Sequence, residues 1–325
     1  MRTNVAVYAS ASVPVIPVYS LEQRAQIRGS MWTARGPLPW GPRPYQPDNI
    51  ITIDYYEHFS ASDQDLILDL YAKQRRYTSA PMGPMVDPGY HGQLPASEFR
   101  SNPRPYFEAA AKLERAGVKV IHFVRPDRDA AGLAWTVDDL DRELGPVFRS
   151  AEAQALMHTV CLGWEPGPRY FYNNDWWVEM CQWMARTFPK ALRLIHMVSD
   201  CDAPVGRDDD WRGITNGQGW ANVAPYIHGF LAQYGGYVEG QSVGEFIPNI
   251  QHAIRDLKRR FATGGPDGTW PRSSAWGDGQ PIRVYAGEYA AYRSYWENSP
   301  ESESVQIGDA AMAVGADGFL DGGTA

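Results

Sequence analysis

Two apolar runs of this chain each end in a glutamate, and together the two glutamates could perform acid–base or nucleophilic chemistry. The first run is His158-Thr-Val-Cys-Leu-Gly-Trp-Glu165, which a Pro-Gly-Pro sequence then breaks. The second run is Pro281-Ile-Arg-Val-Tyr-Ala-Gly-Glu-Tyr289, which supplies Glu288. A hydrolase of the paired-carboxylate type needs two such carboxylates close together. The remaining elements must therefore hold the two strand ends side by side.

An alternation of strand-like and helix-like segments begins at Asn49. The expected strands cover residues 50–56, 77–86, 118–124, 158–165, 191–198, 236–240, 282–288 and 318–321. Helical patterns lie between them, among them 105–116 and 220–234. Eight strands separated by helices predict the α/β class with a parallel sheet, and their number favours a closed (β/α)8 TIM barrel. A doubly wound open sheet, the main alternative, normally has a Gly-rich turn after its first strand, and no such turn occurs here.

Residues 1–48 are the least regular part of the sequence. Pro alternates with β-branched residues at 12–18, and a second Pro-rich stretch covers 35–47, so both are expected to be extended. Ser20-Leu-Glu-Gln23 has the form of a capping box that opens a short helix ending at Gly29. No helical pattern follows the last strand, so this short helix could fill the eighth place in the outer ring. We expect one domain, with residues 1–48 as an arm and short helix packed on a barrel of residues 49–325.

The catalytic groups of a (β/α)8 barrel come from the carboxyl ends of its strands and the loops after them. In this chain those positions hold Asp54, Glu57, Asp87, His91, Arg125, Asp127, Glu165, His196, Asp200, Asp202, Glu239, Glu288 and Asp321. We call the end of the barrel formed by these positions its mouth, and it is strongly acidic. Some of these carboxylates must pair with arginine or have raised pKa values, because crowded like charges do not all ionise. His122 and His196 lie inside apolar runs and are interpreted as core histidines, whereas His91, in a Pro/Gly loop, is a better substrate contact.

Glutamates at the ends of the fourth and seventh strands resemble the arrangement in the large clan of retaining (β/α)8 glycoside hydrolases. The resemblance implies that Glu165 is the general acid/base and that Glu288 is the nucleophile. Their carboxyl groups would lie about 5–5.5 Å apart for retention, or about 6.5–9.5 Å apart for inversion. Sugar contacts are expected from Trp164, His91, Asp54, Tyr172, Glu239, Tyr285, Trp296 and Asp321, and Glu239 could instead be a nucleophile or base. The clan usually has Asn directly before the fourth-strand glutamate, where this chain has Trp164.

Charge and composition indicate which kinds of partner this protein is expected to bind. The formal net charge is −8 and the basic residues are scattered, which argues against nucleic acid. No stretch of about 18 apolar residues predicts a membrane span, and residues 1–18 are too weakly apolar for a secretory signal. Cys161, Cys181 and Cys201 lack C-x-x-C spacing and are interpreted as reduced, buried thiols rather than zinc ligands. We expect a cytoplasmic or virion-associated protein that binds carbohydrate and uses no metal or cofactor.

Alternative functions stay open at this point. Aromatic residues make up 13% of the chain, and on loops they suit sugar rings and protein interfaces equally well. A non-catalytic (β/α)8 protein that binds glycans, or a structural subunit of a virus particle, would fit the Pro-rich arm. That arm could also join copies into a homo-oligomer. A sugar-phosphate enzyme would require anion binding at 315–323, and the acidic loop 199–210 has carboxylates for calcium but no EF-hand spacing.

Overall fold

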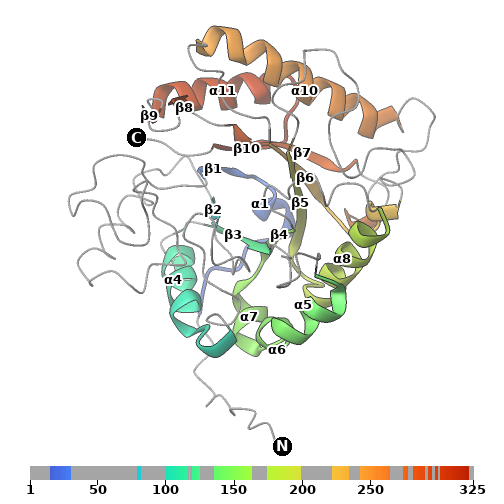
Figure 1. Cartoon of the computed structure of the whole chain (residues 1–325). Coiled ribbons are helices and arrows are strands. Elements are labelled where there is room, and N and C mark those ends of the chain that lie inside the picture. Colours follow the sequence, from blue (N-terminus) through green and yellow to red (C-terminus); the bar gives the residue numbers. More distant parts are fainter. Residues whose placement is uncertain are drawn as a thin grey trace, which may run out of the picture.

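The strands of this protein form a closed ring with helices on its outside (Figure 1). The structure is a computed structural model, and it describes residues 15–30, 79–81, 100–115, 117, 119–124, 135–162, 174–198, 222–233, 242–263, 274–276, 281–289, 292–294, 297–298 and 301–321. Among these residues, no helix is long and apolar enough to cross a membrane.

Eight strands make up the ring, in the order β1-β10-β7-β6-β5-β4-β3-β2. They are β1 (Arg28–Ser30), β2 (Ser79–Pro81), β3 (Lys119–Val124), β4 (Thr159–Leu162), β5 (Leu192–Val198), β6 (Gly229–Gln233), β7 (Arg283–Tyr289) and β10 (Gly318–Asp321). Every neighbouring pair in the ring is parallel. The expected parallel α/β barrel-like architecture is therefore confirmed.

Helices connect most of the described strands and cover the outside of the ring (Figure 1). They are α4 (Arg104–Arg115), α5 (Val137–Glu143), α6 (Gly145–Phe148), α7 (Ala151–Leu156), α8 (Asn174–Thr187), α10 (Val243–Thr263) and α11 (Glu301–Ala313). The helix expected at 105–116 matches α4, and Gly117 follows it with φ of 86°, a conformation that glycine adopts readily. A helix after every strand, as in a complete (β/α)8 barrel, stays a prediction, because residues 31–78 and 322–325 lie outside the described ranges.

Two layers of apolar side chains pack on the two faces of the ring. The inner cluster fills the barrel and consists of Ala25, Ile27, Ile121, Phe123, Cys161, Leu192, Leu194, Leu231, Tyr285 and Leu320. The outer cluster lies between strands and helices and includes Val160, Ile195, Phe230, Val284 and Trp177. Successive residues of a strand point to opposite faces, so a parallel barrel strand is apolar on both. This explains why β3 and β5, which are mostly apolar, were predictable as strands.

The sixth strand lies earlier in the sequence than expected. Residues 229–233, which fall within the helical pattern 220–234, form β6 and pair with β5 and β7. The physical reason is burial on both faces, because Phe230 belongs to the outer cluster and Leu231 to the inner cluster, each fully buried. The prediction of a helix there was wrong, and the strand expected at 236–240 lies outside the described part of the chain.

The first described strand of the ring also comes from an unexpected place. The capping box is confirmed, since the Gln23 N–H donates to the Ser20 hydroxyl and the Ser20 N–H donates to the Gln23 side chain. The helix that it opens, α1 (Leu21–Arg24), is only one turn long. The chain then enters β1, which pairs with β10 and β2. Residues 20–29 therefore lead into a barrel strand instead of filling the outer ring, while the strand expected at 50–56 falls outside the described residues.

A buried ion pair fastens α1 to the barrel. The two guanidinium nitrogens of Arg24 donate to the two carboxylate oxygens of Glu114, over 2.5 and 2.9 Å. Both side chains are shielded from solvent, at 2% and 0% relative exposure. The backbone N–H of Val120 on β3 also donates to Glu114, over 2.9 Å. This carboxylate thus connects α1, α4 and the start of β3, and we call the segment 19–27 with its contacts the floor of the barrel.

Further contacts of the floor involve the first residues of other strands. Lys119, which begins β3, donates from Nζ to the Gln23 carbonyl over 2.5 Å, and its ammonium lies 5.0 Å from the centre of the Tyr19 ring. Arg283, which begins β7, pairs with Glu22. At Gly318, the first residue of β10, a Cβ would come within 2.1 Å of the Ile27 carbonyl oxygen, so only glycine fits there. The floor therefore closes the end of the barrel at which its strands begin.

The floor yields a stability prediction. Replacing Glu114 by Gln should lower the free energy of unfolding by about 3–5 kcal/mol, because Arg24 is left as a buried charge without its counter-ion. The measurement is urea unfolding followed by circular dichroism. Glu108→Gln is the matched control, since its pair with Arg104 also lies on α4 but is exposed. Equal stability of the Glu114→Gln variant and the wild type would show that the ion pair does not fasten the floor.

Candidate active site

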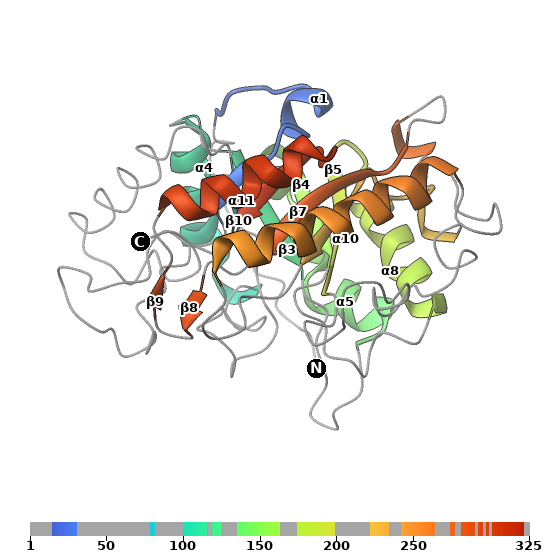
Figure 2. The same ribbon diagram turned by 90° about the horizontal axis from the view of Figure 1, so that it is seen from above.

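The floor covers the end of the barrel at which the strands begin, and the strands finish at the opposite end. Figure 2 shows α1 at one end of the barrel and the two short strands β8 (Tyr292–Ser294) and β9 (Glu297–Asn298) toward the other. The strands are all parallel, so their carboxyl ends meet at the end opposite α1. Catalytic groups of barrel enzymes lie at that end. The candidate active site is therefore the mouth formed by the carboxyl ends of the strands.

Most of the predicted site residues lie outside the described part of the chain. These are Asp54, His91, Trp164, Glu165, Tyr172, Glu239 and Trp296. The backbone is described for Glu288, the sixth residue of β7, and for Asp321, the last residue of β10. Their side chains are not. Tyr285 is the predicted site residue whose side chain the structure places.

The pairing of β7 with β10 becomes irregular at Glu288. Leu320 pairs with Gly287, but the next residue, Asp321, pairs with Tyr289. Glu288 is therefore an extra residue in β7, which is the definition of a β-bulge. Bulges are frequent next to active sites, where they change the direction in which a strand presents its residues. The irregularity falls on the residue that the sequence singled out.

The bulge follows a tightly packed glycine. A Cβ on Gly287 would lie 2.5 Å from Cγ of Leu231, which belongs to the inner cluster on the neighbouring β6. No real Cβ contact is that short, so a larger residue would push β7 away from β6. Gly287 thus keeps the strand seated against β6 immediately before Glu288, so the position of this glutamate depends on the packing below it.

The fourth strand approaches its glutamate in regular geometry. β4 pairs with β3 from His122↔Val160 to Val124↔Leu162, and with β5 from Thr159↔Leu192 to Leu162↔Ile195. Its four side chains are all buried, with Cys161 in the inner cluster. Glu165 follows three residues after the last of these pairings. The described part of β4 therefore ends on the mouth side of the barrel.

Tyr285 does not lie at the mouth, which corrects its expected part in sugar binding. Its side chain is fully buried in the inner cluster, and its hydroxyl donates to the Ala25 carbonyl over 3.0 Å. That carbonyl belongs to the floor. Burial raises the pKa of the Tyr285 hydroxyl well above its ordinary value. The physical reason is its place in the strand, since it is the third residue of β7 and points into the barrel.

The two histidines expected in the core are buried. His122, on β3, is wholly enclosed, and its Nδ1 lies 2.5 Å from the Tyr106 hydroxyl on α4. Burial, then the nearby charge of Arg24, lowers the pKa of His122 to about 3. His196, on β5, is fully buried as well, and its ring meets that of Phe123 edge-on with 5.7 Å between centroids. Their interpretation as buried residues is confirmed.

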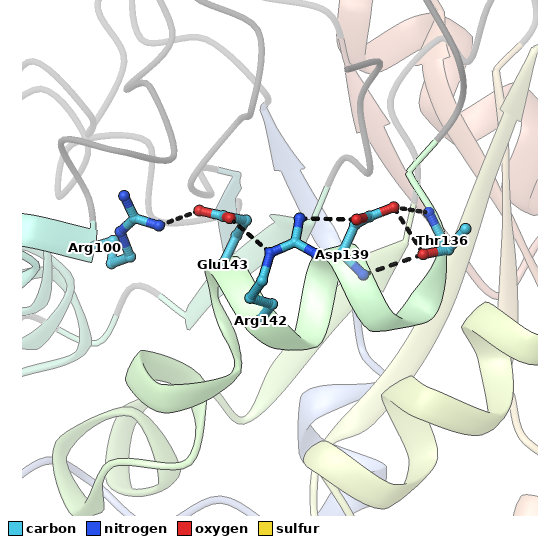
Figure 3. Close-up of polar contacts among 5 residues, drawn as sticks. All are labelled: Arg100, Thr136, Asp139, Arg142 and Glu143. Atoms are coloured by element: carbon cyan, nitrogen blue, oxygen red, sulfur yellow. Dashed lines mark hydrogen bonds and ion pairs between the residues drawn. The ribbon is translucent and has the colours of Figure 1, made fainter. Parts of the chain in front are cut away.

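A polar network lies outside the barrel on α5 (Figure 3). The Thr136 hydroxyl and N–H donate to Asp139 over 2.7 and 2.9 Å, and Arg142 donates to the same carboxylate over 2.8 Å. These hydrogen bonds, with those from Thr136 the largest, lower the pKa of Asp139 to about 2. Arg142 also donates to Glu143, which in turn pairs with Arg100 near the start of α4. The network caps α5 and connects it to the neighbouring segment, and none of its members was a predicted site residue.

No metal site can be assembled from the residues that the structure describes. No group of three or more His, Cys, Asp or Glu side chains among them is arranged to hold an ion. Cys161 and Cys181 are free, buried thiols, and burial raises both of their pKa values. The acidic loop 199–210, whose carboxylates could suit calcium, lies outside the described ranges.

Comparisons with known proteins give structural likenesses alone. No family model and no curated protein matches the chain. Similar solved structures include active domain 2 of a chitinase from Pyrococcus furiosus, with 13% identity over 78% of this chain and 77% of that chain and a TM-score of 0.47. A glucosidase from Croceicoccus marinus has 10% identity, coverage of 80% and 55%, and a TM-score of 0.49. A pyruvate carboxylase from Rhizobium etli has 9% identity, coverage of 96% and 26%, and a TM-score of 0.44.

The structural neighbours thus include (β/α)8 glycoside hydrolases, the class that the sequence resembles, at low identity. The similar structures also include a pyruvate carboxylase.

Buried histidines predict how stability depends on pH. Burial lowers the pKa values of His122 and His228 to about 3, against an ordinary value of about 6.5. Above pH 6.5 both residues are neutral in the folded and unfolded states. Between pH 6.5 and 3 only the unfolded state takes up these protons, so the free energy of unfolding should fall by up to about 1.4 kcal/mol per pH unit for each histidine.

The measurement is urea unfolding at several pH values from 7.5 to 5. His122→Gln should reduce the slope, because glutamine preserves hydrogen-bonding capacity but does not titrate. His252→Gln, on an exposed face of α10, is the control and should leave the slope as it is. A slope in the His122→Gln variant identical to that of the wild type would refute this assignment.

The place of Tyr285 gives a third prediction. Tyr285→Phe should lower the free energy of unfolding by roughly 1 kcal/mol, because one buried hydrogen bond to the Ala25 carbonyl is lost. It should leave glycan affinity unchanged, since the hydroxyl faces the floor. Both are measurable, by urea unfolding and by titration calorimetry with a glycan that the wild type binds. A fall in affinity without a fall in stability would place the residue at the mouth after all.

Proposed function

We propose that this chain is a glycoside hydrolase that cleaves a polysaccharide or glycoconjugate, with Glu165 as general acid/base and Glu288 as nucleophile. The observation that carries the proposal is the β-bulge at Glu288, at the mouth end of β7. The floor adds support, because it covers the opposite end of the barrel and leaves the mouth for substrate. The proposal includes a complete (β/α)8 barrel as the scaffold.

The reaction follows from the two roles. Glu165 donates its proton to the glycosidic oxygen while the Glu288 carboxylate attacks the anomeric carbon, so the bond to the leaving sugar breaks and a glycosyl ester forms. Glu165, now ionised, takes a proton from water, which attacks the same carbon and releases Glu288. The first step needs Glu165 protonated and Glu288 ionised. Two carboxyl groups about 5–5.5 Å apart satisfy this, since the charge of one raises the pKa of the other.

The remaining predicted residues would form the sugar subsites. Trp164, Tyr172 and Trp296 provide flat apolar surfaces, and carbohydrate rings stack on such surfaces through their C–H faces. Polar contacts to hydroxyl groups would come from His91, Asp54, Glu239 and Asp321. Tyr285 is not among them, because it is buried toward the floor. Neither a metal nor a cofactor enters this reaction.

A non-catalytic glycan-binding or structural barrel is the second candidate. The observation in its favour is Trp164, which stands directly before Glu165 where retaining clan members usually have Asn. An N-terminal arm that attaches the barrel to a virus particle or to a second copy would fit the same candidate. Val15 and Val18, at 85% and 94% relative exposure, are the apolar side chains that such an attachment would cover.

The test of hydrolysis uses single substitutions. Glycans that bind the wild type in an array are first screened for cleavage. Glu165→Gln and Glu288→Gln should each lower kcat by at least about 100-fold on a cleaved glycan, because glutamine neither donates a proton readily nor attacks the anomeric carbon. Unfolding midpoints should stay close to that of the wild type.

Glu179→Gln, exposed on α8, is the control and should retain full activity. Full activity in either mouth variant would remove that glutamate from the mechanism. Glycans that bind tightly, with none cleaved by the wild type, would favour the binding protein over the hydrolase.

A further inference from the structure

A pocket outside the barrel, between α5 and α8, has no part in the proposed reaction. The two helices lie next to each other on the outside of the ring (Figure 1), and the indole N–H of Trp183 on α8 donates to Asp141 on α5 over 3.1 Å. The pocket has a volume of about 290 Å³, and its lining includes Val137, Asp138, Asp141, Arg149, Trp183 and Arg186. Pockets that bind small molecules start at roughly 300 Å³, so this one suits a ligand no larger than an amino acid or a single sugar ring.

An ion pair fixes the inner side of this pocket. Arg149 donates to the carboxylate of Asp141, which also accepts the hydrogen bond from Trp183. The pair lies directly over Gly145, where a Cβ would come within 2.8 Å of both side chains. The hydrogen bond from Arg149 is the main cause that lowers the pKa of Asp141, so this carboxylate is ionised and already has its partners. The indole of Trp183, at 2% relative exposure, supplies an ordered apolar wall.

Two charged side chains of the lining have no such partner. Asp138 on α5 and Arg186 in the last turn of α8 are both exposed. Within the described part of the chain, neither forms an ion pair or a side-chain hydrogen bond, and Arg186 acts on Asp141 through its charge alone. The pocket therefore presents one carboxylate and one guanidinium, from two different helices, that do not pair with each other.

This arrangement of charges complements a ligand that carries one charge of each sign. The guanidinium of Arg186 can bind a carboxylate through two parallel N–H donors, and the carboxylate of Asp138 accepts hydrogen bonds from an ammonium group. A dianion such as a phosphate ester would be repelled by Asp138 and Asp141 together. A ligand with only a positive charge would be repelled by the two arginines. A zwitterion satisfies both helices.

We propose that the pocket between α5 and α8 binds a small zwitterion, whose carboxylate pairs with Arg186 and whose ammonium group pairs with Asp138. The body of the ligand lies against Trp183 and Val137. Two kinds of molecule have this chemistry, namely a free α-amino acid and an amino sugar that carries a carboxylate. The inference does not depend on hydrolysis at the mouth, since no residue that lines the pocket belongs to the proposed catalytic or sugar-binding residues.

Titration calorimetry with the full chain at about pH 7 tests the charge requirement. L-phenylalanine carries both charged groups, 3-phenylpropionate carries only the carboxylate, and 2-phenylethylamine carries only the ammonium group. Phenylalanine should bind at least about tenfold more tightly than either singly charged probe, because each of those probes lacks one charge-assisted hydrogen bond. Muramic acid, an amino sugar with a carboxylate, forms the second arm. The tighter of the two zwitterions identifies which kind of molecule the pocket takes.

Substitutions locate the binding in this pocket. Arg186→Gln and Asp138→Asn should each weaken binding of the tighter zwitterion by about tenfold or more. Because both side chains are exposed, the unfolding midpoints should stay close to that of the wild type. The matched controls are Arg255→Gln on α10 and Asp309→Asn on α11, which remove the same charges from exposed positions elsewhere.

Three results would overturn the inference. They are the absence of binding by either zwitterion, equally tight binding of a singly charged probe, and unchanged binding in either pocket variant. Weakened binding in both pocket variants, with wild-type affinity in both controls, would support it. None of these results bears on the hydrolase proposal, which is tested at the mouth.

Discussion

The Arg24–Glu114 ion pair is the interaction on which the architecture depends. The helix α1 is only one turn long, and a helix of that length is not stable by itself. With the ion pair, the segment before β1 is fixed against α4 and β3, and β1 can occupy its position between β10 and β2. A charged pair buried this deeply gains little over an apolar substitute, yet losing one partner is costly. Its value here is that it specifies where the first strand enters the ring.

The floor covers the end of the barrel at which the strands begin, so the two ends of the barrel differ. The contacts of Lys119, Arg283 and Tyr285 all lie at the end where the strands begin, and of these three residues Tyr285 was predicted to contact sugar. The described ion pairs on α4 and α5 are likewise structural. The proposed catalysis is carried by different groups, the carboxylates at the strand ends. The bulge in β7 coincides with one of them.

Strands whose own residues are apolar could be predicted from the sequence, whereas features that depend on pairing with distant residues could not. The strands β3 and β5 are buried on both faces, so they are mostly apolar and can be recognised from the sequence. Arg28-Gly-Ser30 has no apolar pattern at all and is a strand only because β10 and β2 lie on either side of it. Tyr285 looked like a mouth residue because its partner, Ala25, is 260 positions away in sequence. The bulge at Glu288 depends on the register with β10, which no window of sequence contains.

The neighbourhood of β1 and β10 has a consequence for how the chain folds. Arg28 pairs with Phe319, so the ring closes only between its first and last strands. During synthesis β1 therefore leaves the ribosome long before the strand that completes its hydrogen bonds. Until then its outer edge, and that of β7, are open to other chains. Pairing between strands so far apart in sequence forms slowly. Folding of this barrel is therefore expected to depend on protection of the edges of β1 and β7 until β10 is in place.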